Sequence, residues 1–156
     1  MSTENPQIET PSSEQIGYVE RFELERSTWS EDVKDIASRF KLAVENMVDV
    51  QVDLYSKRQQ AVDYTHQLIV LQARLKKAWN TEWKKAYDSI LLDQDYRYSE
   101  KEKQKYADEK TSASKLKIEI VQTHIDFFRE TTKTIDNMVF GVKHRLEIED
   151  FKRGNK

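Results

Sequence analysis

The side chains with the clearest chemical potential lie in a basic and aromatic stretch in the middle of the chain. Residues 57–87 carry seven bases and two acids, a net charge of +5. Within this stretch Trp79, Trp83 and Tyr87 recur at every fourth position, so they share one face of a helix. Lysine ammonium groups neutralise phosphates, and exposed aromatic rings stack on unpaired bases. The pattern is typical of a surface for single-stranded nucleic acid.

The candidate contact residues are the seven bases and two tryptophans of this stretch. They are Lys57, Arg58, Arg74, Lys76, Lys77, Trp79, Trp83, Lys84 and Lys85. The same pattern has a second interpretation, in which the tryptophans belong to the core of a helical bundle and the lysines form its solvated rim. The sequence leaves both interpretations open, and with them the exposure of Trp79 and Trp83.

Catalysis has little support in the sequence. His66, His124 and His144 are far apart and lack the spacing of metal ligands, and no serine stands in a nucleophile-elbow motif. Carboxylates alternate with lysines, as in residues 100–103, which is typical of a solvated helix face. The chain has no cysteine, which excludes a disulfide framework, a thiol nucleophile and a cysteine-ligated zinc. We therefore expect no enzyme, and neither a metal nor a cofactor.

Helices are the elements that must position these residues. The 156 residues include only three glycines and two prolines, and neither type occurs between Tyr18 and Phe140. The tight turns of β and α/β folds need both residue types, and the chain has no glycine-rich phosphate loop. Composition alone therefore predicts an all-α protein.

The first predicted helix covers residues from about 29 to about 87. Thr28 and Glu31 match a capping box, which marks a helix start. Apolar residues then recur at two sets of seven-residue intervals over residues 33–78, and Lys57 is the one charged residue among them. Such a repeat favours a left-handed coiled coil. A continuous helix over 33–78 would be roughly 70 Å long, so it must pair or assemble.

A second helix is predicted over residues of about 100–152, after a loop at about 88–99. Ser99 and Glu102 match a further capping box at its start. Its apolar residues recur in steps of three and four and form a stripe wide enough for more than one neighbour. The sequence therefore predicts two long helices in an antiparallel αα-hairpin with coiled-coil character.

The chain is expected to form one domain, over residues 18–156, behind a disordered acidic tail at residues 1–17. Residues 1–30 carry six acids and two bases, so the formal net charge of −2 hides this acidic end. Residues 18–26 fit either a short strand or a helical turn. The longest apolar run, residues 68–71, is far below the ~20 residues of a membrane span, and no signal-peptide pattern is present. We expect a cytoplasmic protein without membrane contact.

Four short motifs recur in an order that has a parallel in a known family. They are Phe140-Gly141-Val142-Lys143-His144 with the later Phe151 and Gly154, Leu54-Tyr55-Ser56-Lys57, Lys76-Lys77, and Arg97-Tyr98. In order and spacing they resemble the UvsY family of recombination mediators from T-even-like bacteriophages, over roughly residues 28–156. The chain departs from that family at Thr81 and Trp83, where the family has bases, and in its acidic N-terminal extension.

The resemblance implies a homo-oligomeric ring, without enzymatic activity, that binds single-stranded DNA. In DNA recombination and repair it would help a RecA-like recombinase replace the single-strand-binding protein, in the host bacterial cytoplasm. The basic stretch is then expected to contact DNA, and the C-terminal helix to drive self-association. The residues expected in self-association are Val121, Ile125, Phe128, Ile135, Val139, Val142, Leu146 and Phe151.

Two alternatives accompany these expectations. A structural coiled-coil protein, such as a phage assembly scaffold or a tail chaperone, would show the same heptads and capping boxes without binding nucleic acid. In addition, Phe128 and Ile135 could pack inside a single hairpin, in which case they would support the fold and not the assembly.

Overall fold

The structure is a computed structural model that describes residues 13–39, 46–91 and 98–154. Within these ranges the chain forms four helices, α1 (Ser13–Ser38), α2 (Met47–Leu91), α3 (Glu100–Lys110) and α4 (Ser112–Gly154). No described residue lies in a strand, which confirms the all-α prediction. None of the described helices is long and apolar enough to cross a membrane.

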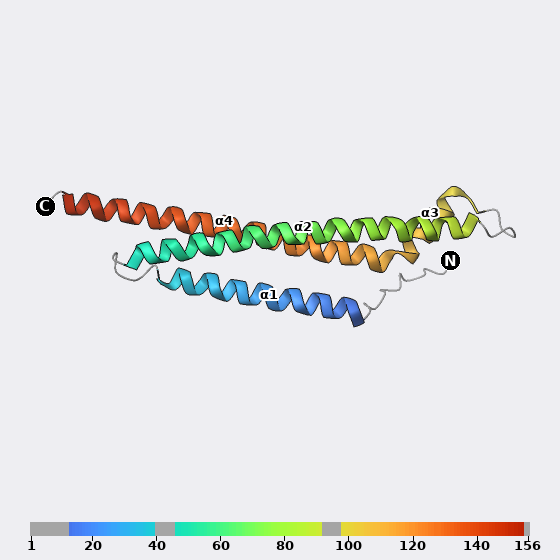
Figure 1. Cartoon of the computed structure of the whole chain (residues 1–156), viewed down its shortest axis with the longest axis horizontal. Helices are drawn as coiled ribbons and strands as arrows, with labels where there is room; N and C mark the ends of the chain where they lie inside the picture. The colour runs from blue at the N-terminus through green and yellow to red at the C-terminus, as the bar shows by residue number, and fades with distance from the viewer. Residues whose placement is uncertain (1–12, 40–45, 92–97, 155–156) are drawn as a thin grey trace, which may run out of the picture.

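Helices α2 and α4 form the long axis of the molecule and run side by side in opposite directions (Figure 1). Arg58 of α2 pairs with Asp136 of α4, and further along α2 Gln72 donates a hydrogen bond to Gln122 at 2.8 Å. The 45 residues of α2 correspond to a length of about 68 Å. Different helices cover the two ends of this long pair.

Helix α1 covers the end of the pair where α2 begins. Asp32 of α1 pairs with Lys57, and Glu25 accepts a hydrogen bond from Tyr64, so α1 runs antiparallel to α2. Figure 1 shows that α1 follows only part of the α2–α4 pair. The short helix α3 packs on the opposite end, against the last turns of α2.

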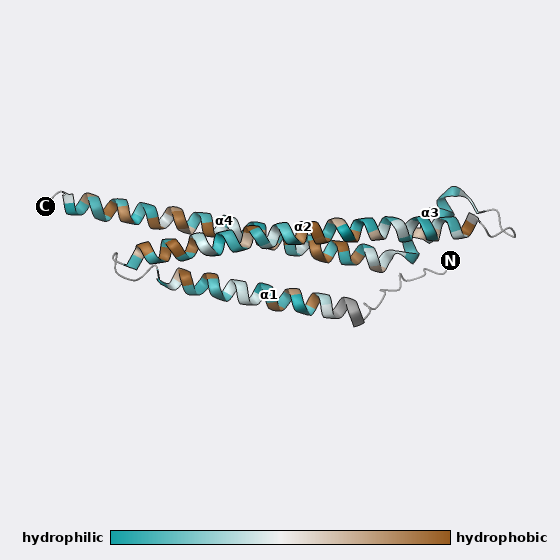
Figure 2. Ribbon diagram, in the orientation of Figure 1, coloured by the Kyte–Doolittle hydropathy of each residue, from teal (hydrophilic) through white to brown (hydrophobic). Residues whose placement is uncertain are grey.

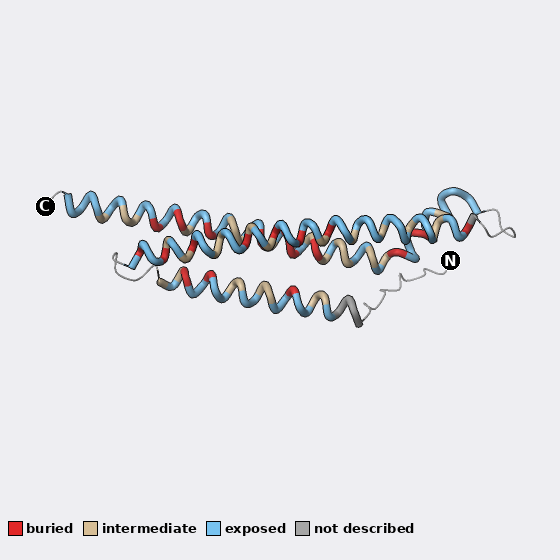
Figure 3. Tube along the Cα trace, in the orientation of Figure 1, coloured by how far each residue is buried: buried red, intermediate tan, exposed pale blue. Residues whose placement is uncertain are grey.

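Two core clusters hold the three long helices together, and Figure 3 shows buried positions recurring along all three. The first cluster consists of Val33, Ile36, Met47, Val50, Leu54, Ile135, Val139 and Val142. The second consists of Phe22, Ala61, Leu68, Val121, Ile125 and Phe128. Each cluster takes residues from α1, α2 and α4 (Figure 2). The apolar positions of the sequence thus form a core that three helices share.

The prediction of one helix over residues 29–87 is wrong, because this range contains parts of α1 and α2. Arg39 and Asn46 adopt 3₁₀ geometry, and the repeat positions Phe40 and Ala43 lie outside the described residues. The heptad repeat stays in phase across this interval because α1 and α2 face the same core cluster. An apolar repeat therefore fails to separate one long helix from two helices that share a core.

The predicted capping box at Thr28 is also corrected, because Thr28 lies inside α1. Its hydroxyl donates to the carbonyl oxygen of Leu24 at 3.0 Å, the bond of a threonine within a helix. The helix begins at Ser13, so residues 13–17 of the predicted tail are helical, and residues 18–26 are helix and not strand. Residues 1–12 lie outside the described part of the chain.

The second predicted helix is close to what the structure contains. The capping box of Ser99 and Glu102 is confirmed, with both reciprocal hydrogen bonds formed at the start of α3. Thr111 then separates α3 from α4, and α4 continues to Gly154. The predicted loop at 88–99 begins too early, because α2 extends to Leu91, and residues 92–97 lie outside the described ranges.

Candidate nucleic-acid interface

Five of the predicted DNA-contacting bases lie on the exposed surface of α2 towards its C-terminal end. They are Arg74, Lys76, Lys77, Lys84 and Lys85. Among the described residues, no carboxylate forms an ion pair with any of these five side chains; Lys76 donates to the amide oxygen of Gln72 at 3.1 Å. Their positive charge is therefore available to a ligand. We call these five residues the basic surface.

Three of these lysines border a shallow groove of about 440 Å³ on α2. It is lined by Ala73, Lys76, Lys77, Asn80, Thr81 and Lys84. The amide of Asn80 and the hydroxyl of Thr81 add hydrogen-bonding groups between the ammonium groups. Phosphate oxygens are acceptors for all of these groups, so the chemistry of the groove suits a phosphodiester backbone.

The two remaining predicted bases are held in ion pairs within the chain. Lys57 pairs with Asp32 of α1, and its ammonium group lies 4.0 Å from the ring centroid of Trp29. Arg58 pairs with Asp136 of α4, and this hydrogen bond raises the pKa of Arg58 above its usual value. Both residues therefore join helices in this structure, and they lie apart from the basic surface. The acids that pair with them come from other helices, which the local charge count did not consider.

The aromatic residues of the stretch share one face of α2, as predicted, but that face is turned towards α3. Trp83 donates its ring N–H to Asp108 at 2.8 Å, and the hydroxyl of Tyr87 donates to Glu100 at 2.6 Å. The rings of Trp83 and Tyr87 stack with centroids 5.2 Å apart. Trp79 donates to the hydroxyl oxygen of Thr111 at 3.1 Å. The rings are half-buried, which neither of the two sequence interpretations described.

Sequence reasoning missed the partners of these aromatic residues. Glu100, Asp108 and Thr111 occupy positions on α3 and at its end that point towards α2. A spacing of eight residues between Glu100 and Asp108 is the only signal in the sequence that places them on one helical face. The hydrogen bond to Glu100 raises the pKa of Tyr87 above its usual value.

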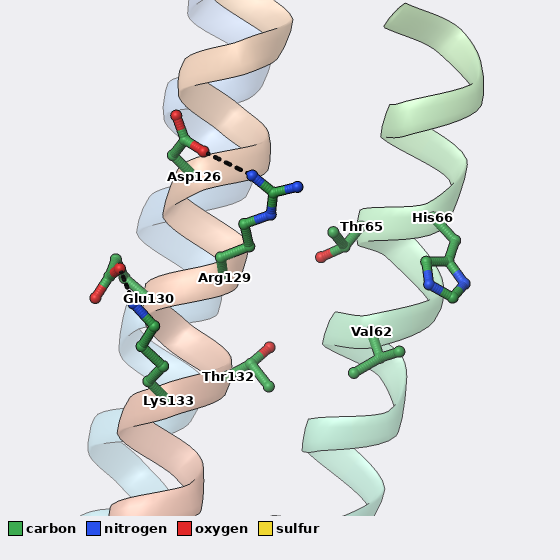
Figure 4. A pocket seen from close by; sticks show the side chains of 8 residues that line it. All are labelled: Val62, Thr65, His66, Asp126, Arg129, Glu130, Thr132 and Lys133. Carbon is green, nitrogen blue, oxygen red and sulfur yellow. Dashed lines mark hydrogen bonds and ion pairs between the residues drawn. The ribbon is translucent and has the colours of Figure 1, made fainter. Parts of the chain in front are cut away.

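A second groove, of about 500 Å³, lies between α2 and α4 and offers a contrast to the basic surface (Figure 4). Its lining residues are Val62, Thr65, His66, Asp126, Arg129, Glu130, Thr132 and Lys133. Arg129 pairs with Asp126 at 3.3 Å, and Lys133 pairs with Glu130 at 2.6 Å. Each base in this groove is thus matched by a neighbouring acid, which leaves little net charge to attract a phosphate.

The residues predicted to drive self-association lie mostly inside the chain. Val121, Ile125, Phe128, Ile135 and Val142 are at most 1% exposed, and Val139 is 7% exposed. They contact α1 and α2 of the same chain because the wide stripe of α4 has two neighbours there. Leu146 is half-buried against the first cluster, and Phe151 is 72% exposed. The structure thus places seven of the eight residues wholly or partly inside the chain, and Phe151 alone is fully available to another chain.

Comparisons with protein-family models, with curated proteins and with solved structures found no match.

Proposed function

We propose that the protein binds single-stranded DNA through the basic surface of α2 and acts as a recombination mediator. In this role it would assemble as a homo-oligomer and help a RecA-like recombinase replace the single-strand-binding protein. The observation that carries the proposal is the set of five exposed bases on α2, none of which has a carboxylate partner in the described chain. The four motifs shared with recombination mediators support the biological role.

A single basic surface is expected to bind a strand with low affinity, so the proposal depends on several copies of this surface in one oligomer. Sites linked in one assembly raise the effective concentration of each for the same strand, and the combined affinity can exceed a single one by 10²–10⁴. Non-specific contacts with the phosphate backbone suit a mediator, because such a protein must act on any sequence.

A second apolar seam on α2 supports self-association. Val48, Tyr55, Val62 and Ile69 recur at intervals of seven residues, and three of them are at least 40% exposed. Tyr55 and Phe140 of α4 line one shallow groove, and Phe140 is 72% exposed. No described α1 residue lines the grooves beside this seam. We assign it as the contact between copies, in place of the buried stripe of α4.

The DNA-binding proposal is tested with a fourfold variant, Lys76→Ala, Lys77→Ala, Lys84→Ala and Lys85→Ala. We expect it to lose binding to a fluorescein-labelled oligo(dT), measured by anisotropy at low salt, and to keep its helical content and mass. A matched control removes the same charge elsewhere, with Lys34→Ala, Lys133→Ala, Lys152→Ala and Arg153→Ala, all exposed. It is expected to bind nearly as the unmodified protein does.

The structural coiled-coil alternative predicts a different result. A scaffold or tail chaperone would show the same assembly but no salt-dependent affinity for single strands. Equal binding by the fourfold variant and its control would show that the basic surface is not the site, and would contradict the proposal.

A further inference from the structure

We propose that α3 is a displaceable lid over the aromatic side of α2, bonded to the polar edges of Trp83 and Tyr87, so that single-stranded DNA and α3 compete for these rings. The inference rests on the proposed function and adds regulation to the same site. When α3 is closed, a bound strand contacts only the basic surface, through its phosphates. When α3 is open, the bases of the strand can also stack on the rings of Trp83 and Tyr87.

The contacts between α3 and the rings are polar and few. Trp83 is bound through its N–H to Asp108, and Tyr87 through its hydroxyl to Glu100. These bonds hold the outer edges of two rings that already lie parallel, with an angle of 14° between their planes. The rings are thus presented as a stacked pair before any base arrives, and the two carboxylates of α3 hold that pair in place.

Helix α3 is held to the bundle by little apolar packing. Ala107 is its only described buried residue, and the helix has 11 residues, with charged side chains at eight of them. Isolated helices of this length are marginal in water, so the fold of α3 depends on its cap and its contacts. Displacing α3 therefore uncovers few apolar groups of α3 itself.

Thr111 supplies the point about which α3 can turn. It lies between α3 and α4 with φ −110° and ψ 10°, outside the helical region, and it is 4% exposed. Its hydroxyl donates to the carbonyl of Ala107 and accepts from Trp79. Trp79 thus stays anchored beside α4, and the rings that opening frees are those of Trp83 and Tyr87.

The carboxylates of α3 are placed to compete with the phosphates of a DNA strand. Glu100 and Asp108 hold carboxylates against the polar edges of Tyr87 and Trp83. Lys84 and Lys85, which lie between these two rings in sequence, would bind the phosphates of a strand. Nucleic acid that reaches the basic surface repels these carboxylates and offers bases as new stacking partners. Binding of a strand therefore favours the open position of α3 by differential affinity for the two states.

The test uses two double variants of equal net charge. In Glu100→Ala/Asp108→Ala, both acceptors are lost, whereas Glu100→Gln/Asp108→Asn loses the same charge and keeps an acceptor oxygen for each ring group. We expect the alanine pair to bind oligo(dT) at least about fivefold more tightly than the amide pair, because loss of one hydrogen bond changes the open population by about that factor.

A third variant loosens the lid without a change of charge. Ser99→Ala removes the capping box at the start of α3, which weakens the helix at an exposed site. It is also expected to bind oligo(dT) more tightly than the unmodified protein.

Acrylamide quenching of tryptophan fluorescence measures how far α3 shields the tryptophan rings in the absence of DNA. In a Trp29→Phe background, Trp79 and Trp83 remain, and the alanine pair is expected to be quenched more strongly than the amide pair. If the unmodified protein binds oligo(dT) and the two pairs bind equally, the lid is contradicted and the proposed function stands. If no variant binds, the proposed function fails, and the competition fails with it.

Discussion

Glu25 of α1 accepts hydrogen bonds from three side chains and joins three helices at one point. Tyr64 of α2 and His124 of α4 both approach Oε2, at 2.5 and 3.1 Å, and Arg21 donates to Oε1. Burial raises the pKa of Glu25, but these hydrogen bonds outweigh it and lower the pKa overall. Burial and the bond to Glu25 raise the pKa of Tyr64 to about 12, so Tyr64 remains a donor.

His124 makes the stability of this junction dependent on pH. The ring is 0% exposed and stacks on Phe22 at 4.0 Å, and its Nδ1 has no partner among the described residues. Burial lowers the pKa of His124, although Glu25 opposes the shift; Arg21 and Arg26 add to it. The unfolded chain thus takes up a proton first, and stability should fall as the pH drops below the usual histidine value of 6.5.

We predict that His124→Gln removes most of the fall in stability that begins below about pH 6.5. The glutamine amide keeps a donor for Glu25 and does not titrate, so stability at neutral pH should fall while the slope becomes flat. Urea denaturation at a series of pH values measures both. Below pH 4.5 protonation of Glu25 should destabilise both proteins. A slope equal to that of the unmodified protein would contradict this assignment.

Phe128 shows why the self-association stripe could not be located from sequence. The side chain is 0% exposed, and its ring meets Trp29 of α1 at 5.0 Å and Tyr64 of α2 at 4.8 Å, both edge to face. A stripe wide enough for two neighbours has the same sequence pattern whether those neighbours belong to one chain or to several.

We predict that Phe128→Ala costs about 3–5 kcal/mol of stability, through lost burial and the cavity left behind. Thermal denaturation followed by circular dichroism measures the loss. Light scattering at low temperature should give the mass of the unmodified protein, because Phe128 faces its own chain. A lower mass without lower stability would instead return Phe128 to an interface between copies.

At the scale of elements, α1 is the helix that was predicted least accurately from the sequence. Helices α2 and α4 share many contacts along their length, whereas α1 touches them mainly through Phe22, Trp29, Val33 and Ile36. All four residues are apolar in the sequence, but the last three were assigned to a longer helix over residues of about 29–87. The capping box of Ser99 and Glu102 was predicted correctly, whereas the equally local match at Thr28 and Glu31 was wrong because Thr28 lies inside α1.

We predict that Phe22→Ala releases the N-terminal half of α1 before the rest of the chain unfolds. Phe22 is 4% exposed and is the only described α1 residue buried in the second core cluster, so its loss leaves the half-buried Tyr18 and Trp29 and the hydrogen bonds of Glu25 as contacts there. Hydrogen exchange should accelerate in residues 18–30 while α2 and α4 keep their protection. Uniform acceleration along all helices would mean that α1 is part of one cooperative unit.

In the candidate site, features set by spacing along one helix were predictable, and contacts between distant residues were not. The basic surface and the shared face of Trp83 and Tyr87 were predictable, because helical spacing alone decides them. The ion pairs of Lys57 and Arg58, and the cover of α3 over the rings, depend on residues 13 to 78 positions away. Tertiary contacts of that kind have no periodic signature in the sequence.

At the scale of the whole molecule, opposite ends carry different surfaces. The end covered by α1 bears the open seam of Val48, Tyr55 and Val62, and the end covered by α3 bears the basic surface. Copies that meet through the first end would leave the second free. This arrangement would let one assembly present several basic surfaces to one strand.

We predict that Tyr55→Glu and Val62→Glu lower the mass of the assembly, because each buries a charge in the seam between copies. Leu24→Glu is the matched control, since Leu24 is 70% exposed on α1 and lies outside the seam. Light scattering after size exclusion measures the mass, and circular dichroism checks the fold. An unchanged mass for both seam variants would refute the proposed contact.

The salt dependence of oligo(dT) binding tests the central claim most directly. Each phosphate neutralised on a single strand contributes a slope of about −0.7 to a plot of log affinity against log salt concentration. Engagement of the five bases of the basic surface by one protomer should therefore give a slope of about −3.5, and more for several protomers on one strand. We expect tight binding at low salt with at least that slope. No binding at low salt, or an affinity that salt leaves unchanged, would contradict the account.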